Sequence, residues 1–154
     1  MIFQPLTAQD GPQLADLGAA MAFAPAPQVL GETLSAALAQ GGAAFGALEE
    51  GALAGALLLV RTAPDAARVT CGVRPSHERR GIGGLLLRMA DDWAWENGVA
   101  RLEIAVRKED LVARHVFDRH GYGSAGFRRG VAGPDGQTFD ELLLEKPVPP
   151  REEA

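Results

Sequence analysis

A glycine-bearing segment between a strand and a helix carries the clearest chemical signal in the sequence. Residues 73–87 read Val-Arg-Pro-Ser-His-Glu-Arg-Arg-Gly-Ile-Gly-Gly-Leu-Leu-Leu. They follow a stretch rich in β-branched residues, 68–73, that predicts a strand ending before a proline. From Gly83 onward, apolar residues recur with the spacing of one helix face, and Asn97-Gly98 is typical of a helix end. The segment is therefore predicted to join a strand to the start of a long helix.

The start of this predicted helix has the chemistry of an anion site. The first N–H groups of a helix have no internal partner, and the peptide dipoles give that end a partial positive charge. Gly81, Gly83 and Gly84 leave the backbone open to an anion, and neighbouring arginines add positive charge. The same glycines can instead serve only a tight turn and close packing, and the local residues leave both interpretations open. A dinucleotide fingerprint is excluded because Leu86 stands where its third glycine belongs.

The segment resembles motif A of the GNAT superfamily, the acetyl-CoA-dependent N-acetyltransferases. The resemblance rests on Val73-x-Pro75, Arg80-Gly81-Ile82-Gly83 and Leu85-Leu86, and it departs from the family at Glu78, where Arg or Gln is usual. It implies that backbone N–H groups of the loop bind the diphosphate of coenzyme A, and that the preceding strand pairs with the pantetheine arm. The cofactor-binding residues that it implies are Cys71, Gly72, Val73, Arg79, Arg80, Gly81, Ile82, Gly83, Gly84, Asp110 and Phe117.

The stretch from Leu102 to Tyr122 is similar to the family's region between the fifth strand and a Gly-Phe pair. Asp110 stands where Asn is usual, and Phe117 stands where a tyrosine often protonates the leaving thiolate. A phenyl ring cannot donate that proton. Other groups must then handle protons when a neutral amine attacks the thioester. The candidate catalytic residues are Glu103, His115 and Tyr122, for which a surface carboxylate, a solvated histidine and a packed ring are the alternative interpretations.

Composition limits the cofactors and partners that we expect. The single cysteine, Cys71, excludes an internal disulfide and is interpreted as a small buried apolar residue rather than a nucleophile. Three scattered histidines predict no metal site. The net charge is −5, and no basic stripe is present, so we expect no nucleic-acid partner. Residues 1–60 hold five acids and no base, which would favour a cationic acceptor if they lined its site; ordinary solvated surface is the preferred interpretation.

The sequence predicts a cytoplasmic protein without a membrane segment. No Lys or Arg precedes Arg61, so the basic region of a secretory signal is missing from this stretch. The longest apolar run, residues 52–60, is too short to span a bilayer.

Periodicity and turn residues predict eleven elements in the order β-α-α-β-β-β-α-β-α-β-β. This is the GNAT order, and the resemblance implies an α/β (α+β) fold. That fold has a single mixed, mostly antiparallel sheet of six to seven strands, helices on both faces and a central splayed pair of parallel strands. We expect one domain over residues 1–146 and a disordered tail over 147–154. The expected strands are 2–6, 43–49, 52–61, 68–73, 101–106, 124–131 and 138–145, and the helices 10–21, 32–40, 83–96 and 109–120 with an apolar stripe of Val112, Ala113, Val116 and Phe117.

The resemblance implies transfer of an acetyl group from acetyl-CoA to a primary amine in a ternary complex. A small-molecule amine is preferred as acceptor over a peptide or protein, and the quaternary state is left as monomer or homodimer. Two alternatives stay open: a coenzyme A-binding regulatory module with weak or no turnover, for which Glu78 and Phe117 speak, and transfer of a longer acyl group.

Overall fold

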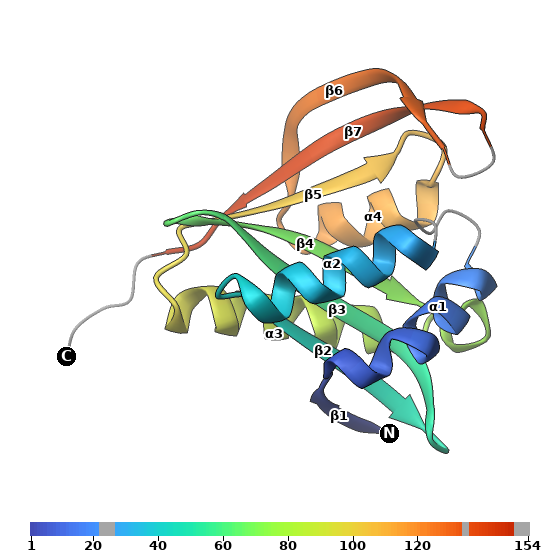
Figure 1. Ribbon diagram of the computed structural model, residues 1–154. Helices are drawn as coiled ribbons and strands as arrows, with labels where there is room; N and C mark the ends of the chain where they lie inside the picture. The colour runs from blue at the N-terminus through green and yellow to red at the C-terminus, as the bar shows by residue number, and fades with distance from the viewer. Residues whose placement is uncertain (22–26, 134–135, 150–154) are drawn as a thin grey trace.

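The chain folds around one mixed sheet of seven strands, in the order β1-β2-β3-β4-β5-β7-β6 (Figure 1). A computed structural model describes residues 1–21, 27–133 and 136–149. Every neighbouring pair is antiparallel except β4 and β5, which run parallel. The strands are β1 Ile2–Pro5, β2 Ala43–Glu49, β3 Ala52–Ala63, β4 Ala66–Val73, β5 Arg101–Arg107, β6 Gly123–Ala132 and β7 Thr138–Pro147.

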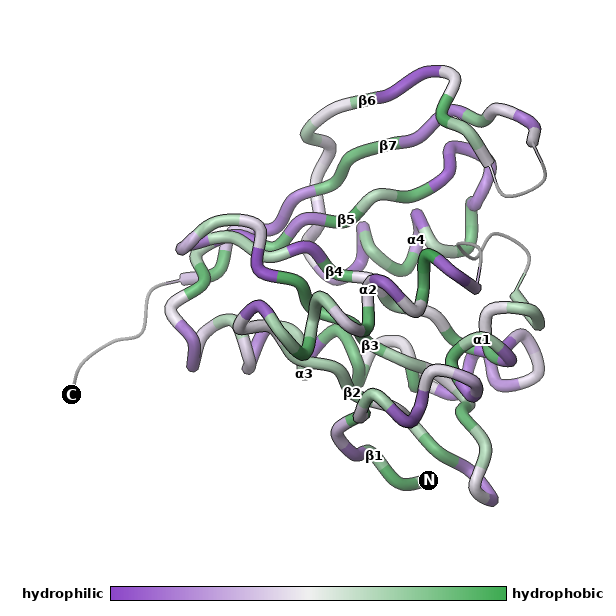
Figure 2. Tube along the Cα trace, viewed as in Figure 1, coloured by the Kyte–Doolittle hydropathy of each residue, from purple (hydrophilic) through white to green (hydrophobic). Residues whose placement is uncertain are grey.

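Two pairs of helices cover the two faces of the sheet (Figure 1). The first pair is α1 (Gly11–Ala20) with α2 (Pro27–Ala39), and the second is α3 (Ile82–Glu96) with α4 (Leu111–Arg119). β3 is apolar on both faces and packs against both layers, as Figure 2 shows by its long hydrophobic stretch. The hydrophilic stretches of β6 mark it as an edge strand with little burial.

The parallel pair at the centre of the sheet is short. β4 and β5 pair only from Ala66 to Arg68, opposite Arg101 to Glu103. Beyond that point β4 continues to pair with β3, and β5 continues to pair with β7, so the two strands separate. The splayed parallel pair expected from the resemblance is therefore confirmed, together with the mixed sheet and the helices on both faces.

Local sequence signals explain most element boundaries. Thr7 and Asp10 form a capping box at the entry to α1, because Asp10 accepts from the Thr7 N–H at 2.7 Å. The expected start of α2 at Glu32 is wrong, since the helix begins at Pro27, whose missing N–H is not needed in a first turn. The sequence also suggests a helix break over residues 24–27; residues 24–26 lie outside the described residues, and Pro27 begins α2 instead.

Two further expectations need correction. Val112 is 61% exposed, so it does not belong to the buried apolar face of α4. Phe117 is the residue of that helix that is buried. The ordered domain also extends past residue 146, because β7 ends at Pro147 and the Val148 N–H donates to the Ala100 carbonyl at 2.8 Å. In the described ranges, no helix is long and apolar enough to cross a membrane.

Candidate active site

The loop before α3 presents a set of backbone N–H groups without protein partners. A short 3₁₀ turn, Pro75–His77, precedes it, and Gly81 occupies the N-cap of α3 with φ 80°. In the part of the chain that the structure describes, no N–H from Arg79 to Gly84 donates a hydrogen bond to a protein acceptor. Arg79 to Gly81 are exposed to solvent. These are the properties of an anion site at a helix start.

The three glycines of this loop serve different purposes. Gly81 needs its positive φ, which side chains rarely adopt. A side chain at Gly83 would meet only Val73, at 3.6 Å, so this position borders the end of β4 and is otherwise open. A side chain at Gly84 would lie 3.3 Å from Nε2 of His120, which follows α4. Gly84 therefore permits close packing between α3 and α4, the second of the two interpretations that the sequence left open.

Ion pairs hold the loop against the sheet. Arg80 donates to Glu49 of β2 at 2.8 Å, and Nε2 of His77 lies 3.7 Å from the same carboxylate. The hydrogen bond from Arg80 lowers the pKa of Glu49 below its ordinary value. Arg74 is engaged elsewhere, because it donates to the Leu53 carbonyl and to Asp16. Glu78 is exposed, so its charge is screened by water where it departs from the family pattern.

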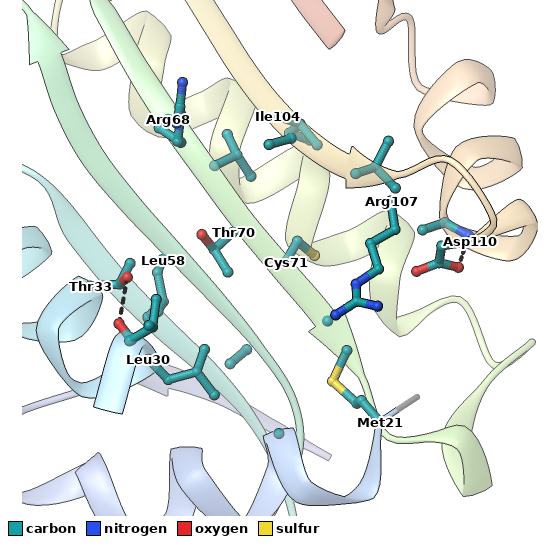
Figure 3. A pocket seen from close by; sticks show the side chains of 18 of the residues that line it. Met21, Leu30, Thr33, Leu58, Arg68, Thr70, Cys71, Ile104, Arg107 and Asp110 are labelled. Atoms are coloured by element: carbon teal, nitrogen blue, oxygen red, sulfur yellow. Dashed lines mark hydrogen bonds between the residues drawn. The ribbon is translucent and has the colours of Figure 1, made fainter. Parts of the chain in front are cut away.

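A cavity of about 560 Å³ opens where β4 and β5 separate (Figure 3). Four of the predicted cofactor-binding residues line it: Cys71 and Gly72 on the side of β4, and Asp110 and Phe117 on the side of α4. A Cβ at Gly83 would lie 3.6 Å from Val73, which follows Gly72 at the end of β4, so the loop lies next to the end of this strand. The structure thus brings the two groups of predicted cofactor residues to the same end of β4.

The remaining walls come from elements far apart in the sequence: α1, α2, β3, β5, β6 and β7. α1 and α2 contribute an apolar wall that includes Leu14, Leu17 and Leu30. Met21 lies over the backbone of Gly72, where a side chain would be only 2.4 Å from the methionine methyl carbon. β5 contributes Arg107, and β7 contributes Phe139 and Glu141.

The structure does not place the candidate catalytic residues in this cavity. Glu103 lies at the closed end of the splay, where its carboxylate accepts from Arg101 at 3.2 Å and lies 3.7 Å from Arg68. His115 is on the exposed face of α4. Tyr122 is 3% exposed and packs edge to face on Phe117, with ring centroids 6.0 Å apart. Burial raises the pKa of its phenol above the ordinary value, and its hydroxyl has no partner among the described residues.

Two predicted cofactor residues in the cavity wall, Asp110 and Cys71, have a defined hydrogen bond and a defined protonation state, respectively. Asp110 is the N-cap of α4, because its carboxylate accepts from the Ala113 N–H at 3.1 Å (Figure 3). Burial raises the pKa of the Cys71 thiol to about 12, so the sulfur stays protonated at neutral pH. A protonated thiol is a poor nucleophile, which agrees with its interpretation as a small apolar residue.

Three charged residues of the cavity were missed by the sequence reasoning: Arg68, Arg107 and Glu141. Arg107 follows Val106 at the end of β5, where strand alternation places it on the face opposite to the buried residues of that strand. Glu141 lies directly across from it on β7. The alternation of β5 was visible in the sequence, but the pairing of Arg107 with Glu141 depends on the register between two strands that are distant in the chain.

None of the five acids among residues 1–60 lines the cavity. Asp10 caps a turn, Asp16 pairs with Arg74, and Glu49 pairs with Arg80. The expectation that these acids form ordinary surface fits this placement better than an acidic wall for a cationic acceptor does, although Asp16 and Glu49 also form ion pairs that were not expected. In the ranges 1–21, 27–133 and 136–149, no group of three or more His, Cys, Asp or Glu residues is placed to hold a metal ion.

The structure therefore combines a splayed parallel strand pair with a helix start whose N–H groups are open. The chain belongs to the acetyltransferase (GNAT) family, whose model matches residues 16–122, more than half of the sequence.

Known relatives agree with this assignment. The chain is 31% identical over 78 residues to streptothricin acetyltransferase of Streptomyces lavendulae, a match that covers 50% of this chain and only 41% of that relative. The structure is similar to the ribosomal-protein-S18-alanine N-acetyltransferase of Escherichia coli, with a TM-score of 0.79, 22% identity, and coverage of 99% and 96% of the two chains. It is also similar to Ard1 of Thermoplasma volcanium, with a TM-score of 0.81, 11% identity, and coverage of 96% and 97%. At these identities, the two structures show a shared fold.

Proposed function

We propose that the protein transfers the acetyl group of acetyl-CoA to a primary amine by direct attack in a ternary complex. The observation that carries the proposal is the run of unpartnered N–H groups from Arg79 to Gly84, next to a cavity between two separated strands. These N–H groups would bind the diphosphate, and Arg79 and Arg80 would add charge near it. Because Gly83 borders Val73, the pantetheine arm can pass from the loop along the end of β4 into the cavity.

The proposed reaction forms one bond and breaks one. The nitrogen of a neutral amine attacks the thioester carbonyl carbon, a tetrahedral oxyanion forms, and the carbon–sulfur bond then breaks. The edge of β4 beyond Arg68 is not paired to β5, so its backbone N–H groups near Cys71 are candidates to stabilise the oxyanion. The amine loses one proton, and the departing thiolate takes up one proton. Phe117 lines the cavity but cannot donate it.

A small-molecule amine fits the cavity better than a folded protein does. The volume of about 560 Å³ lies within the usual range for small-molecule sites, and helices α1 and α2 enclose one side of it. The streptothricin acetyltransferase relative is named for a small-molecule acceptor, whereas the Escherichia coli neighbour is named for a protein acceptor. The two names therefore leave both kinds of acceptor in the test panel.

The decisive experiment is a change at Gly83. Gly83→Glu places a carboxylate against the proposed diphosphate site, so we expect binding of acetyl-CoA, measured by calorimetry, to weaken by at least about 100-fold, as expected for two or three lost charge-assisted hydrogen bonds. Gly83→Ala is the milder comparison, because its methyl group meets Val73 at an ordinary contact distance and carries no charge, so it should weaken binding much less than Gly83→Glu does. Unchanged binding by Gly83→Glu would show that the site is elsewhere.

A coenzyme A-binding module without turnover is the second candidate. Phe117 in the cavity, in place of a proton donor, is the observation that favours it. Release of free thiol from acetyl-CoA should be followed with amino acids, polyamines, aminoglycosides and peptides as acceptors. Tight binding of acetyl-CoA without thiol release from any amine would select the module over the enzyme.

A further inference from the structure

The ionisable residues of the cavity carry information about the acceptor. The charged ones are Arg68, Arg107, Asp110 and Glu141, since the Cys71 thiol stays protonated. Asp110 caps α4, and Arg68 lies at the closed end, facing Glu103 across the parallel pair. Arg107 and Glu141 are the charged residues that β5 and β7 present together, and each also has a neighbour in the fold: the Phe139 ring for Arg107 and Arg128 for Glu141.

From this pair we infer that the acceptor is a small zwitterionic amine, an amino acid or a close analogue, whose carboxylate is bound by Arg107 and whose amino group lies at Glu141. The inference rests on the proposed acetyltransferase function and names the acceptor class of that same site.

Arg107 is held in a geometry that suits carboxylate binding. Its guanidinium carbon lies 3.9 Å from the centre of the Phe139 ring, so the ring covers one face of the guanidinium. The N–H donors lie in the guanidinium plane, and a carboxylate can accept two of them at once. Figure 3 shows the side chain extending from the end of β5 into the cavity, toward the side where Met21 and Cys71 lie.

Glu141 stands beside Arg107 because of strand register. The two residues are direct cross-strand partners on β5 and β7, and side chains of such partners share one face about 5 Å apart at Cβ. The Glu141 side chain is 16% exposed, and Nη1 of Arg128 on β6 lies 3.9 Å from it. One guanidinium and one carboxylate side by side match the two charged groups of an amino acid, which are attached to the same carbon atom of the ligand.

The opposite wall fits the side chain of such an acceptor. Leu14, Leu17 and Leu30 line the cavity from α1 and α2, and each is at most 5% exposed. An apolar amino-acid side chain would gain from contact with this wall. The class is therefore an amino acid with an apolar side chain, for which L-leucine is a suitable probe.

The test compares three amines with the same apolar side chain: L-leucine, L-leucinamide and 3-methylbutylamine, which lacks the carboxyl group. In the Arg107→Gln variant, we expect KM for L-leucine to rise at least 10-fold with little change in kcat, and both parameters for the other two amines to change less than about 3-fold. Arg107→Lys should recover part of the loss, because it keeps the charge without the planar fork. Comparing each variant with wild type on the same amine removes differences in amine basicity.

Arg129→Gln is the matched control. Arg129 lies on β6 with its guanidinium 5.7 Å from the ring of Phe127, and neither residue lines the cavity. This variant removes the same charge from a similar ring contact, so it should leave all three amines unaffected.

Two results would overturn the inference. One is an equal loss by Arg107→Gln on all three amines, which would place Arg107 at the donor or in the fold. The other is failure of L-leucine to bind, by calorimetry, to wild-type protein saturated with coenzyme A. Failure of the proposed function has a different signature, because wild-type protein would then not bind acetyl-CoA or would release thiol with no amine at all.

Discussion

At the scale of single residues, the cavity departs from its family in the groups that could move protons. Phe117 lines it where a tyrosine would offer a phenol, and the phenol of Tyr122 is buried outside it. A thiolate is a tolerable leaving group, so the site can work by positioning and by stabilising the oxyanion. Under the proposed function, residues that hold the reactants matter more than an acid, so the loop, Arg107 and Glu141 are the positions to test.

The reactivity of Cys71 tests how far its thiol is excluded from solvent. Its thiol has a pKa of about 12 instead of the ordinary 9.0, so at pH 8 the thiolate fraction should be about a thousandfold lower than in the unfolded chain. We expect alkylation by iodoacetamide, followed by mass spectrometry, to be slower by a similar factor than in urea. Since the folded-state pKa is raised, this thiol contributes its stability fully below pH 9 and loses it as the pH rises toward 12. Alkylation at the unfolded rate would contradict this account of burial.

At the scale of elements, tight packing between α2 and the sheet fixes the cavity wall. A Cβ at Gly42 would lie 1.9 Å from the Leu59 carbonyl oxygen and 2.8 Å from that of Ala37. Both obstacles are backbone atoms, which cannot rotate away. We expect Gly42→Ala to lower the free energy of unfolding by about 3 kcal/mol, measured by urea denaturation.

Gly31 in the middle of α2 is the matched control for this change. A Cβ there would meet nothing within 4 Å, and alanine is the better helix former. Gly31→Ala should therefore raise the free energy of unfolding by about 0.5–1 kcal/mol. Equal effects of the two substitutions would show that packing against β3 does not set the requirement for glycine at position 42.

The elements also show how much the sequence alone could predict. The loop at Gly81, the capping box at Thr7 and the strands were predictable, because local periodicity and turn chemistry determine them. The start of α2 was not, since Pro27 is as compatible with a helix start as with a break. The neighbours of Arg107 were also hidden, because only the register of β5 on β7 brings Glu141 beside it.

The three candidate catalytic residues show that sequence reasoning can also select residues that the fold places outside the cavity. Glu103, His115 and Tyr122 were chosen for their chemistry and their nearness to a recognisable stretch. Their placement depends on which face of a strand or helix meets the cavity, and on ion pairs such as the one between Glu103 and Arg68. A single sequence does not reveal which face of an element meets the cavity or which ion pairs form, because both depend on strand register and packing. Their proposed roles in proton transfer remain predictions, and the cavity offers Glu141 as a better-placed carboxylate.

At the scale of the whole molecule, the sheet belongs to both apolar clusters. β3 places Leu57 and Leu59 in the cluster with α3, and Leu58 in the cluster with α1 and α2. Unfolding of either helical layer would expose apolar residues of β3 to water. We therefore expect one cooperative unfolding transition. The proposed acetyl-CoA site spans the α3 loop and the end of β4, so a ligand bound there should stabilise the molecule as one unit.

Acetyl-CoA at 100 times its dissociation constant should therefore raise the free energy of unfolding by about 2.7 kcal/mol. For a chain of this size, that corresponds to an increase in Tm of roughly 5–10 °C, measured by differential scanning calorimetry. Gly83→Glu should unfold at nearly the wild-type Tm without ligand and gain little when acetyl-CoA is added, because its side chain fills an open position. Two separate transitions in wild type would refute the shared core. A shift of equal size in Gly83→Glu would instead show that acetyl-CoA stabilises the fold from a site other than the N–H groups of residues 79–84.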